Sequence, residues 1–438
     1  MLNLLLIFFG KSISSISKLL NLGNGSTWPG HIALLANKNF IRDLTSNSSL
    51  KIVVVAGTNG KTTTGKMITT ILKEDKKRVF QNTAGANLLN GIASTLLLHT
   101  NIFGRLNKDY AVFEIDENVL PLFLKELTPD AIILLNLFRD QLDRYGEIDT
   151  IAKKWHTALA TLPETTTVYL NADDPQIAYL GEALRTDVQY FGLEEKSAHK
   201  TLQHASDSIY CPNCHTKLMY KKIYYSHLGD WHCPTCKLKR PMPNMSIAYF
   251  PLSGDYNKYN TLAAALFAKN EGIKNTIIEK ALKKVKPAFG RQEIIEIDGK
   301  KAQIFLSKNP TSFNQSLDTI KHLGGKTVLL ILNDRIPDGR DVSWIWDIDI
   351  EEYMDNFENI IVTGDRVYDI ALRMQYTFNR HSGSEASPES TKLNIYENLE
   401  DAVQQSLLLI KPNETLYILP TYSAMLEIRK ILTGKKIL

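Results

Sequence analysis

The segment from Ile52 to Thr64, IVVVAGTNGKTTT, restricts the possible fold more than any other part of the sequence. Four apolar residues, Ile52–Val55, read as a buried strand that leads into a glycine turn. A helical pattern follows, with apolar residues at Met67, Ile68, Ile71 and Leu72. Such a turn directs backbone N–H groups and a helix N-terminus toward one anion. The segment therefore predicts a parallel α/β sheet with a phosphate-binding loop.

The candidate nucleotide ligands are the residues of this loop: Gly57, Thr58, Asn59, Gly60, Lys61, Thr62 and Thr63. Lys61 offers a positive charge to phosphate, and the Thr62 hydroxyl can bind Mg²⁺. Val55 stands where the strict Walker motif has its first glycine, so the loop is a shortened variant. The alternative is a plain tight turn after a core strand, but lysine and threonine follow Gly60 in the order that ATP binding requires.

Strands and helical segments alternate over most of the chain, which indicates helices covering parallel sheets. The expected strands are 51–55, 110–115, 131–136 and 167–171, then 303–306, 327–332, 359–363 and 416–419. We expect a helical arm over 1–45, an ATP-binding domain over 46–292 with an insertion at 206–243, and a smaller Rossmann-like α/β domain over 293–438.

The N-terminal segment MLNLLLIFFG has an apolar run of about nine residues, short of the roughly 20 that span a bilayer. We expect an amphipathic or docking helix, with contact to the membrane surface as the minority alternative. The cysteine usage gives no sign of a disulfide scaffold. The expected location is the cytoplasm, with the inner face of the membrane as the alternative.

All four cysteines form two CxxC pairs, Cys211 with Cys214 and Cys233 with Cys236, and eighteen residues separate the pairs. This is the spacing of a zinc ribbon, in which four thiolates surround Zn²⁺ and leave no position for water. The pattern predicts a structural site. Neighbouring His215 and His232 are more easily explained as bystanders than as ligands.

Zinc ribbons also bind nucleic acid, and the insertion carries basic and aromatic residues at Lys217, Tyr220, Lys221, Lys222, Tyr224, Tyr225, Lys237, Lys239 and Arg240. The net charge of the chain is only +4, which favours a solvated surface over a nucleic-acid face. We expect no nucleic-acid partner.

Several motifs in order resemble the Mur ligase family, which includes the folylpolyglutamate synthases. GTNGKTT resembles its ATP loop and FEIDE its magnesium carboxylate, here Glu114; NLFRDQLDRYGE, residues 136–147, resembles the segment after the next strand. NADDP, with Asp173, resembles a nucleotide-contacting motif. GDYNKYNTLAA resembles the helix start that places Asn257 and Asn260 at the adenine, and FGRQE places Arg291 at the terminal phosphates. The resemblance implies ATP and Mg²⁺ as cofactors.

Two departures from the Mur ligase pattern bear on the chemistry. Gln141 stands where these ligases have a histidine in a DHLD-like segment, which removes one usual metal contact. Ser307 and Lys308 stand where they have aspartate and histidine before Asn-Pro. We therefore expect altered amino-acid-adding chemistry, and we hypothesise that Lys308 contacts the carboxylate or phosphate of the substrate.

The ribbon and the motif DGRDVSWIWDID resemble the MurT family, the synthetase subunits of lipid II isoglutaminyl synthase, from about Ser26 to the C-terminus. The resemblance implies phosphorylation of the α-carboxylate of D-glutamate in the lipid II stem peptide, followed by displacement with ammonia. It also implies a heterodimer with a GatD-type glutaminase. Independently, a glutaminase needs a nucleophilic cysteine, and all four cysteines here are committed to the ribbon.

By the same resemblance, Asp341 of DGRD is the carboxylate that orients the histidine of the partner glutaminase and completes its triad. Two alternatives remain: Asp341 caps the following helix or pairs with Arg340, or another acid of the segment, Asp338, Asp347 or Asp349, fills the role. The nucleotide, the substrate carboxylate and the ammonia should meet in a cleft between the two domains.

Two rival functions stay open from the sequence. A stand-alone ligase of the Mur or folylpolyglutamate type would add an amino acid through the same acyl phosphate without a partner. A nucleotide-regulated zinc-ribbon binding protein would show salt-dependent affinity for nucleic acid and no acyl-phosphate turnover.

Overall fold

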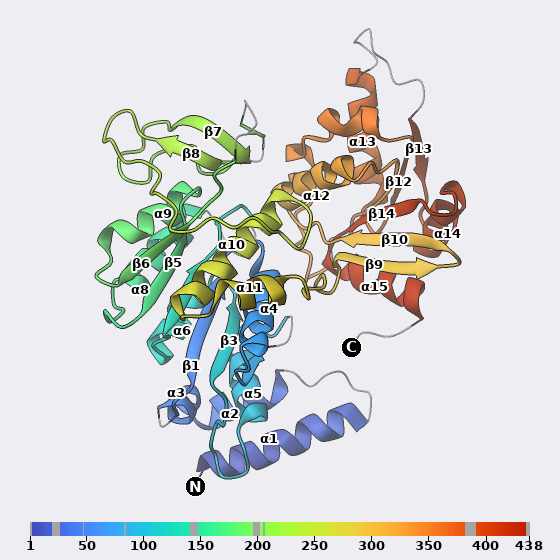
Figure 1. Cartoon of the computed structure of the whole chain (residues 1–438). Helices are drawn as coiled ribbons and strands as arrows, with labels where there is room; N and C mark the ends of the chain where they lie inside the picture. The colour runs from blue at the N-terminus through green and yellow to red at the C-terminus, as the bar shows by residue number, and fades with distance from the viewer. Residues whose placement is uncertain are drawn as a thin grey trace.

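Two α/β domains lie next to each other, and a helical arm runs along the end of the first one (Figure 1). The computed structural model describes residues 2–19, 27–46, 48–82, 85–140, 148–195, 202–204, 206–381 and 391–434. The arm consists of α1 (Leu2–Leu19), α2 (Trp28–Ala36) and α3 (Phe40–Thr45).

The arm packs on α5 (Leu89–His99) of the first domain through small residues that allow close approach. A Cβ added at Gly30 of α2 would fall 2.0 Å from the backbone oxygen of Asn90, so this crossing requires glycine. The Gly30 amide donates to the Ser94 hydroxyl at 2.7 Å. The expected helical arm is thus present and anchored to the domain.

The first sheet has the order β2-β3-β1-β4-β5-β6, and every neighbouring pair in it is parallel. Its strands are β1 (Lys51–Ala56), β2 (Val79–Gln81), β3 (Tyr110–Ile115), β4 (Ala131–Leu134), β5 (Thr167–Asn171) and β6 (Asp187–Phe191). The helices and the short 3-10 turn on its two faces are α4 (Lys61–Glu74), α5, α6 (Leu120–Glu126), α8 (Ile148–Leu159), α9 (Pro175–Leu180), η1 (Gly181–Ala183), α10 (Asp255–Asn270) and α11 (Asn275–Leu282).

The chain leaves β1 at the point where the strand order reverses, because β3 lies on one side of β1 and β4 on the other. Ligands of open α/β sheets bind at this switch point, outside the carboxyl ends of the strands. Alternate residues of β1 enter two separate cores, with Val54 in one and Val55 in the other. Both faces of the strand are therefore fixed, and so is the loop that follows it.

The insertion forms a small antiparallel sheet of β7 (Met219–Tyr225) and β8 (Leu228–His232). It packs onto α9 in a cluster that contains Cys211, Cys233 and Trp231. The Trp231 indole N–H donates to the backbone oxygen of Ala172 at 3.1 Å, directly after β5. The insertion is thus attached to the carboxyl edge of the first sheet.

The second sheet has the order β13-β12-β11-β14-β10-β9. It is parallel except for β9 at one edge. The domain comprises β9 (Arg291–Ile297), β10 (Lys300–Phe305), α12 (Pro310–His322), β11 (Thr327–Ile331), η2 (Ser343–Asp347), η3 (Ile350–Asn356), β12 (Asn359–Thr363), α13 (Val367–His381), β13 (Lys392–Ile395), α14 (Leu399–Leu409), β14 (Thr415–Pro420) and α15 (Tyr422–Thr433).

The expected domain boundary between 292 and 293 falls inside β9, which already pairs with β10 from Arg291. The second domain therefore begins at this strand, after Gly290. From Glu293 onward the residues of β9 alternate between half-buried and exposed, as expected for an edge strand, whereas Gln292 is buried. The strand therefore lacks the long apolar run that marked the central strands. The expected strand over 131–136 ends at Leu134, and Asn136 instead contacts the phosphate loop.

Candidate functional site

A cavity of about 410 Å³ lies between the two domains, at the carboxyl end of β1. Residues of the phosphate loop, the segment after β3 and the start of α10 line it from the first domain. The second domain contributes Arg291, Gln292, Phe305, Leu306, Lys308, Thr311, Ser312, Gln315, Ser316, Pro337 and Tyr422. The structure thus brings the expected ATP loop and Lys308 to the same space.

The phosphate loop is held in a conformation that glycine makes possible. Gly60 has a φ of 96°, and a Cβ there would lie 2.1 Å from Asn260 Oδ1. The Asn59 amide donates to Asn136 Oδ1 at 2.9 Å, and Asn136 Nδ2 donates to the Asn59 carbonyl at 3.1 Å. Contacts with Asn136 and Asn260 therefore hold the loop in this conformation.

Lys61 contacts the loop and an acid that the sequence analysis did not single out. Its Nζ donates to the Gly57 carbonyl at 2.5 Å and pairs with Glu117 Oε2 at 3.1 Å. Burial alone would raise the pKa of Glu117, but the charges of Lys61 and Lys308 lower it below the usual value. Glu117 is thus a buried anion at the mouth of the loop.

Thr62 and Glu114 lie close enough together to share a divalent cation. The Thr62 hydroxyl donates to Glu114 Oε2 at 2.5 Å. Burial raises the pKa of Glu114, and the Thr62 hydrogen bond and the charge of Arg291 oppose this shift. A hydroxyl and a carboxylate oxygen are hard ligands of the kind that Mg²⁺ takes.

A buried ion pair connects the two domains across the cavity. Lys308 Nζ, in the turn before α12, donates to Asp140 Oδ2 of the first domain. Burial alone would lower the pKa of Lys308, but Asp140 and Glu117 raise it. Burial raises the pKa of Asp140. Gln141, expected to replace a metal-binding histidine, lies outside the described residues.

Asn257, Asn260 and Arg291, the candidates for the adenine and phosphate contacts, all line the cavity. The Asn260 amide donates to Asn257 Oδ1 at 3.2 Å, and both side chains are buried. Burial lowers the pKa of Arg291. Tyr225 of the insertion lines the same cavity. The sequence analysis placed it on a possible nucleic-acid face instead, because β7 is far from the loop along the chain and no local pattern links the two.

Asp173 lies apart from these residues and is not among those lining the cavity. Its carboxylate accepts from Arg240 at 2.5 Å, from the Tyr259 hydroxyl at 2.6 Å and from the Leu193 amide at 2.8 Å. The expected nucleotide contact is therefore not visible in this arrangement. Asp173 instead joins the insertion to α10.

Asp341 is exposed on the loop before η2, away from the cavity lining. Its Oδ1 accepts from the Ser343 amide at 2.8 Å, and hydrogen bonds from the side chain and then the backbone of Ser343 lower the pKa of Asp341. Asp338 and Asp349 are buried: Asp338 accepts from the Ser423 amide and hydroxyl, and Asp349 accepts from Asn314. Asp347 is half-buried and pairs with Arg139 at 3.4 Å. Asp341 is thus the most accessible of the four acids.

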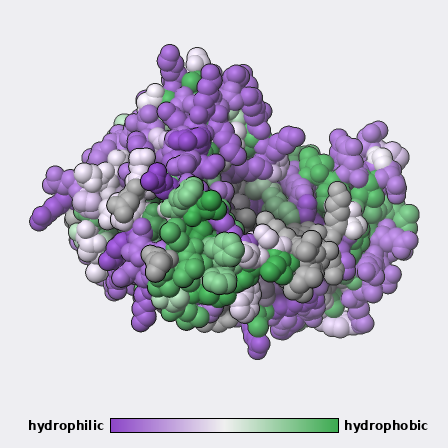
Figure 2. All heavy atoms as spheres, turned by 90° about the horizontal axis from the view of Figure 1, so that it is seen from below, coloured by the Kyte–Doolittle hydropathy of each residue, from purple (hydrophilic) through white to green (hydrophobic). Residues whose placement is uncertain are grey.

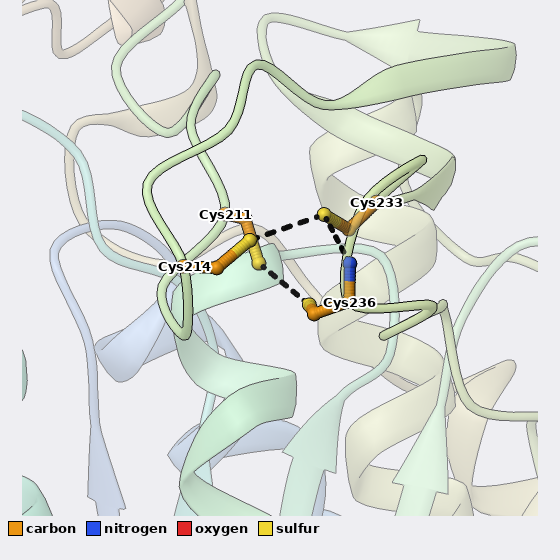
Figure 3. Close-up of side chains that lie close together, drawn as sticks. All are labelled: Cys211, Cys214, Cys233 and Cys236. Carbon is orange, nitrogen blue, oxygen red and sulfur yellow. Dashed lines mark hydrogen bonds between the residues drawn. The ribbon is translucent and has the colours of Figure 1, made fainter.

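The four cysteine sulfurs point toward a common centre from two loops of the insertion (Figure 3). All four Sγ atoms lie within 4.8 Å of one another, and the shortest separations are 3.4 and 3.5 Å. A tetrahedron with Zn–S bonds of about 2.3 Å has edges of roughly 3.8 Å, so the cluster fits one metal ion. His215 and His232 contribute no atom to it.

Two of the three tyrosines of the suggested nucleic-acid face are buried, and Tyr220 is half-buried. Tyr224 and Tyr225 are 3% and 2% exposed. The Tyr224 hydroxyl donates to the Leu193 carbonyl at 2.7 Å, which fixes the insertion to the sheet. These side chains have no face available for stacking on bases.

Comparisons with known proteins agree with this geometry. The Mur ligase middle domain family matches residues 55–268, and the MurT ligase C-terminal family matches residues 306–425. The subunit MurT of lipid II isoglutaminyl synthase (glutamine-hydrolyzing) from Streptococcus pneumoniae is 34% identical over 446 residues, 97% of this chain and 96% of that protein. The chain belongs to the MurT family.

Solved structures show the same fold at lower identity. A pseudomurein peptide ligase type C from Methanothermus fervidus has a TM-score of 0.65 at 22% identity, covering 90% of this chain and 80% of that one. The MurF ligase of Thermotoga maritima in complex with ADP has a TM-score of 0.61 at 16% identity, covering 90% and 82%. This MurT family member therefore has the Mur ligase fold, with a ribbon-like insertion.

The cysteine cluster generates a stability prediction. Cys233→Ser should abolish binding of one metal ion per chain and lower the thermal midpoint by several degrees, because a structural metal contributes to folding directly. His215→Ala, next to the other cysteine pair, is the matched control. It should retain the bound metal ion and the wild-type thermal midpoint. Metal content by elemental analysis and thermal unfolding are the measurements. Full metal content in Cys233→Ser would contradict the assignment.

Proposed function

We propose that this chain amidates the α-carboxylate of D-glutamate in the lipid II stem peptide through an acyl phosphate, as the synthetase subunit of a glutamine-hydrolysing enzyme. The proposal rests on one observation above all, the cavity in which the ATP loop, the Thr62–Glu114 pair and Lys308 of the other domain meet. The name of the pneumococcal relative supplies the substrate and reaction.

The loop residues Gly57–Thr63 would hold the phosphates of ATP, with Asn257 and Asn260 at the adenine side and Arg291 near the terminal phosphate. Thr62 and Glu114 would hold Mg²⁺, which would neutralise charge on the transferring phosphoryl group. The MurF ligase of the same fold was solved in complex with ADP, which supports an adenine nucleotide as the ligand. Asp173 has no part in the proposal, because its oxygens are occupied.

In the proposed reaction, an oxygen of the substrate carboxylate attacks the γ-phosphorus of ATP, and ADP leaves. Ammonia then attacks the acyl carbon, phosphate leaves with the former carboxylate oxygen, and the nitrogen loses a proton to give the amide. Lys308 would place its charge beside the acyl phosphate. The two domains enclose the cavity and would exclude water, which competes with ammonia for the carbonyl carbon of the acyl phosphate.

The cysteine cluster would bind Zn²⁺ with four thiolates and no open position, so the metal would be structural and supply folding energy on the order of 10 kcal/mol. With every cysteine of the sequence in that cluster, this chain has no thiol for glutamine hydrolysis. The nitrogen would come from a GatD-type glutaminase subunit, in the cytoplasm.

The proposal is tested by incubating the chain with ATP, Mg²⁺, lipid II and ammonium, and then with glutamine in place of ammonium, with and without the candidate glutaminase. The expected product carries one amide in place of one hydroxyl on glutamate, seen by mass spectrometry. Ammonium should suffice alone, and glutamine only with the partner. Glutamine use by the isolated chain would contradict the proposal.

Asp341→Asn should lower glutamine-dependent amidation by on the order of 10³-fold in the heterodimer, because the partner's histidine loses the acid that fixes its tautomer. Amidation driven by ammonium should not change, since Asp341 lies outside the cavity. Asp347→Asn is the matched control and should affect neither rate by more than a few fold. Equal loss of both activities in Asp341→Asn would show a structural role instead.

Lys308→Ala should lower ammonium-driven amidation at least about 100-fold, because the acyl phosphate loses a buried positive charge. The variant also leaves Asp140 buried without its partner, so the double variant Lys308→Met/Asp140→Asn serves as the stability control. Loss of activity in the folded double variant supports the role. Unchanged amidation in either variant shows that Lys308 does not act on the substrate.

A further inference from the structure

Helix α1 turns its apolar side away from the protein. Ile7, Gly10 and Ser14 face the first domain, and Gly10 lies so close to α5 that an added Cβ would be 2.6 Å from a Leu97 methyl carbon. On the opposite side, the phenyl groups of Phe8 and Phe9 are 66% and 58% exposed. A surface helix normally presents polar residues on its solvent side. Because these apolar side chains are exposed, nothing within the described residues covers this face of α1.

Neighbouring elements extend the same apolar surface. Ile102 and Phe103, on the loop after α5, are 73% and 72% exposed. This loop lies beside the start of α1, because a Cβ at Gly104 would be 3.1 Å from a Leu4 methyl carbon. Trp28 of α2 adds a ring that is 67% exposed. Seen from below, apolar residues gather into a patch on this end of the molecule (Figure 2).

The charges around this patch are almost all of one sign. Lys11, Lys38 and Arg42 are basic side chains that the structure describes in this part of the chain, and the sequence contains no acidic residue from 1 to 42. Exposed Arg105 follows the apolar loop. The first acid, Asp43, accepts hydrogen bonds from Asn3 at 2.9 Å and Asn37 at 2.8 Å, which lower its pKa. A surface of this kind complements an anionic one.

We propose that this face, formed by α1, Trp28 and the loop at Ile102 and Phe103, docks onto the anionic surface of a lipid bilayer. Aromatic and leucine side chains would enter the boundary between headgroups and acyl chains, and the basic residues would meet the lipid phosphates. The helix would lie in the plane of the membrane. None of the described helices has the length and apolar content to cross a bilayer.

The position of the patch suits a lipid-linked substrate, so this inference rests on the proposed function and deepens it. Leu88, just before α5, lines the cavity, and the far end of α5 meets α1, where Lys11 donates to the Thr100 carbonyl. Eleven residues of helix separate these points, or about 17 Å at 1.5 Å per residue. Docking would hold the cavity about this distance above the membrane surface. The stem peptide of a lipid-linked substrate could reach it, since five extended residues cover roughly the same distance.

The test uses the full chain and sedimentation with vesicles, either phosphatidylcholine alone or equimolar phosphatidylcholine and phosphatidylglycerol. The wild-type chain should bind the anionic vesicles and lose binding as salt rises. Phe8→Ser/Phe9→Ser/Phe103→Ser should bind at least about tenfold more weakly, because three exposed apolar side chains no longer leave water. The matched control is Leu372→Ser/Leu408→Ser, which alters exposed residues of the second domain.

No binding by the wild-type chain, or equal binding by the triple variant, would overturn the proposal. A dimer in light scattering that the triple variant converts to monomer would also overturn it, since a second copy would then cover the patch. Retained binding by the control variant supports it.

A second experiment distinguishes failure of this inference from failure of the proposed function. The triple variant should amidate a water-soluble muropeptide at the wild-type rate with ammonium and lose most activity on lipid II in vesicles. Equal activity on both substrates would refute the docking surface and leave the amidation chemistry standing. Activity of neither protein on either substrate would refute the proposed function, while the vesicle result would still decide membrane binding.

Discussion

The site depends on a cluster of buried opposite charges between the two domains. Glu114, Glu117 and Asp140 come from the first domain, as does Lys61, while Lys308 and Arg291 come from the second. Each buried charge would be costly alone, and an opposite charge nearby offsets part of the cost of removing it from water. The Lys308–Asp140 pair therefore holds the domains together at the place where phosphate and substrate would meet.

The insertion also contacts the segment that holds the phosphate loop. His227, in the turn between β7 and β8, is fully buried, packs its ring 4.8 Å from that of Phe138, and accepts a hydrogen bond from the Asp207 amide. The Phe138 amide in turn donates to the Thr58 hydroxyl at 3.0 Å. The cysteine cluster lies at the other end of this small sheet. The insertion is thus connected to the phosphate loop through His227, Phe138 and Thr58, so the folding of one affects the order of the other.

The sequence was sufficient for features formed by consecutive residues. The phosphate loop, the central strands and the cysteine pairs each depend on local spacing, and the strands β1, β3, β5 and β12 lie within one residue of their expected positions. Short or edge strands such as β2 and β9 were not predicted, because they lack a long apolar run. The MurT family relationship was confirmed by the comparisons.

Contacts between distant segments could not be predicted in this way. Glu117 follows Glu114 by three residues, but its pairing with Lys61 depends on how two loops meet at the sheet edge. Tyr225 reaches the cavity only because the ribbon folds back onto the first domain. Asp173 belongs to a recognisable motif, yet its carboxylate accepts hydrogen bonds from Arg240 and Tyr259. Both partners are distant in the sequence, so no local pattern shows that they bind this carboxylate in place of a nucleotide.

The central claim, that the cavity activates a carboxylate by phosphorylation, is tested most directly by following oxygen. Substrate labelled with ¹⁸O in the glutamate α-carboxylate should transfer one labelled oxygen to inorganic phosphate for each amide formed with ATP and ammonium. Phosphate free of label, with amide still produced, would mean that no acyl phosphate forms and would contradict the account.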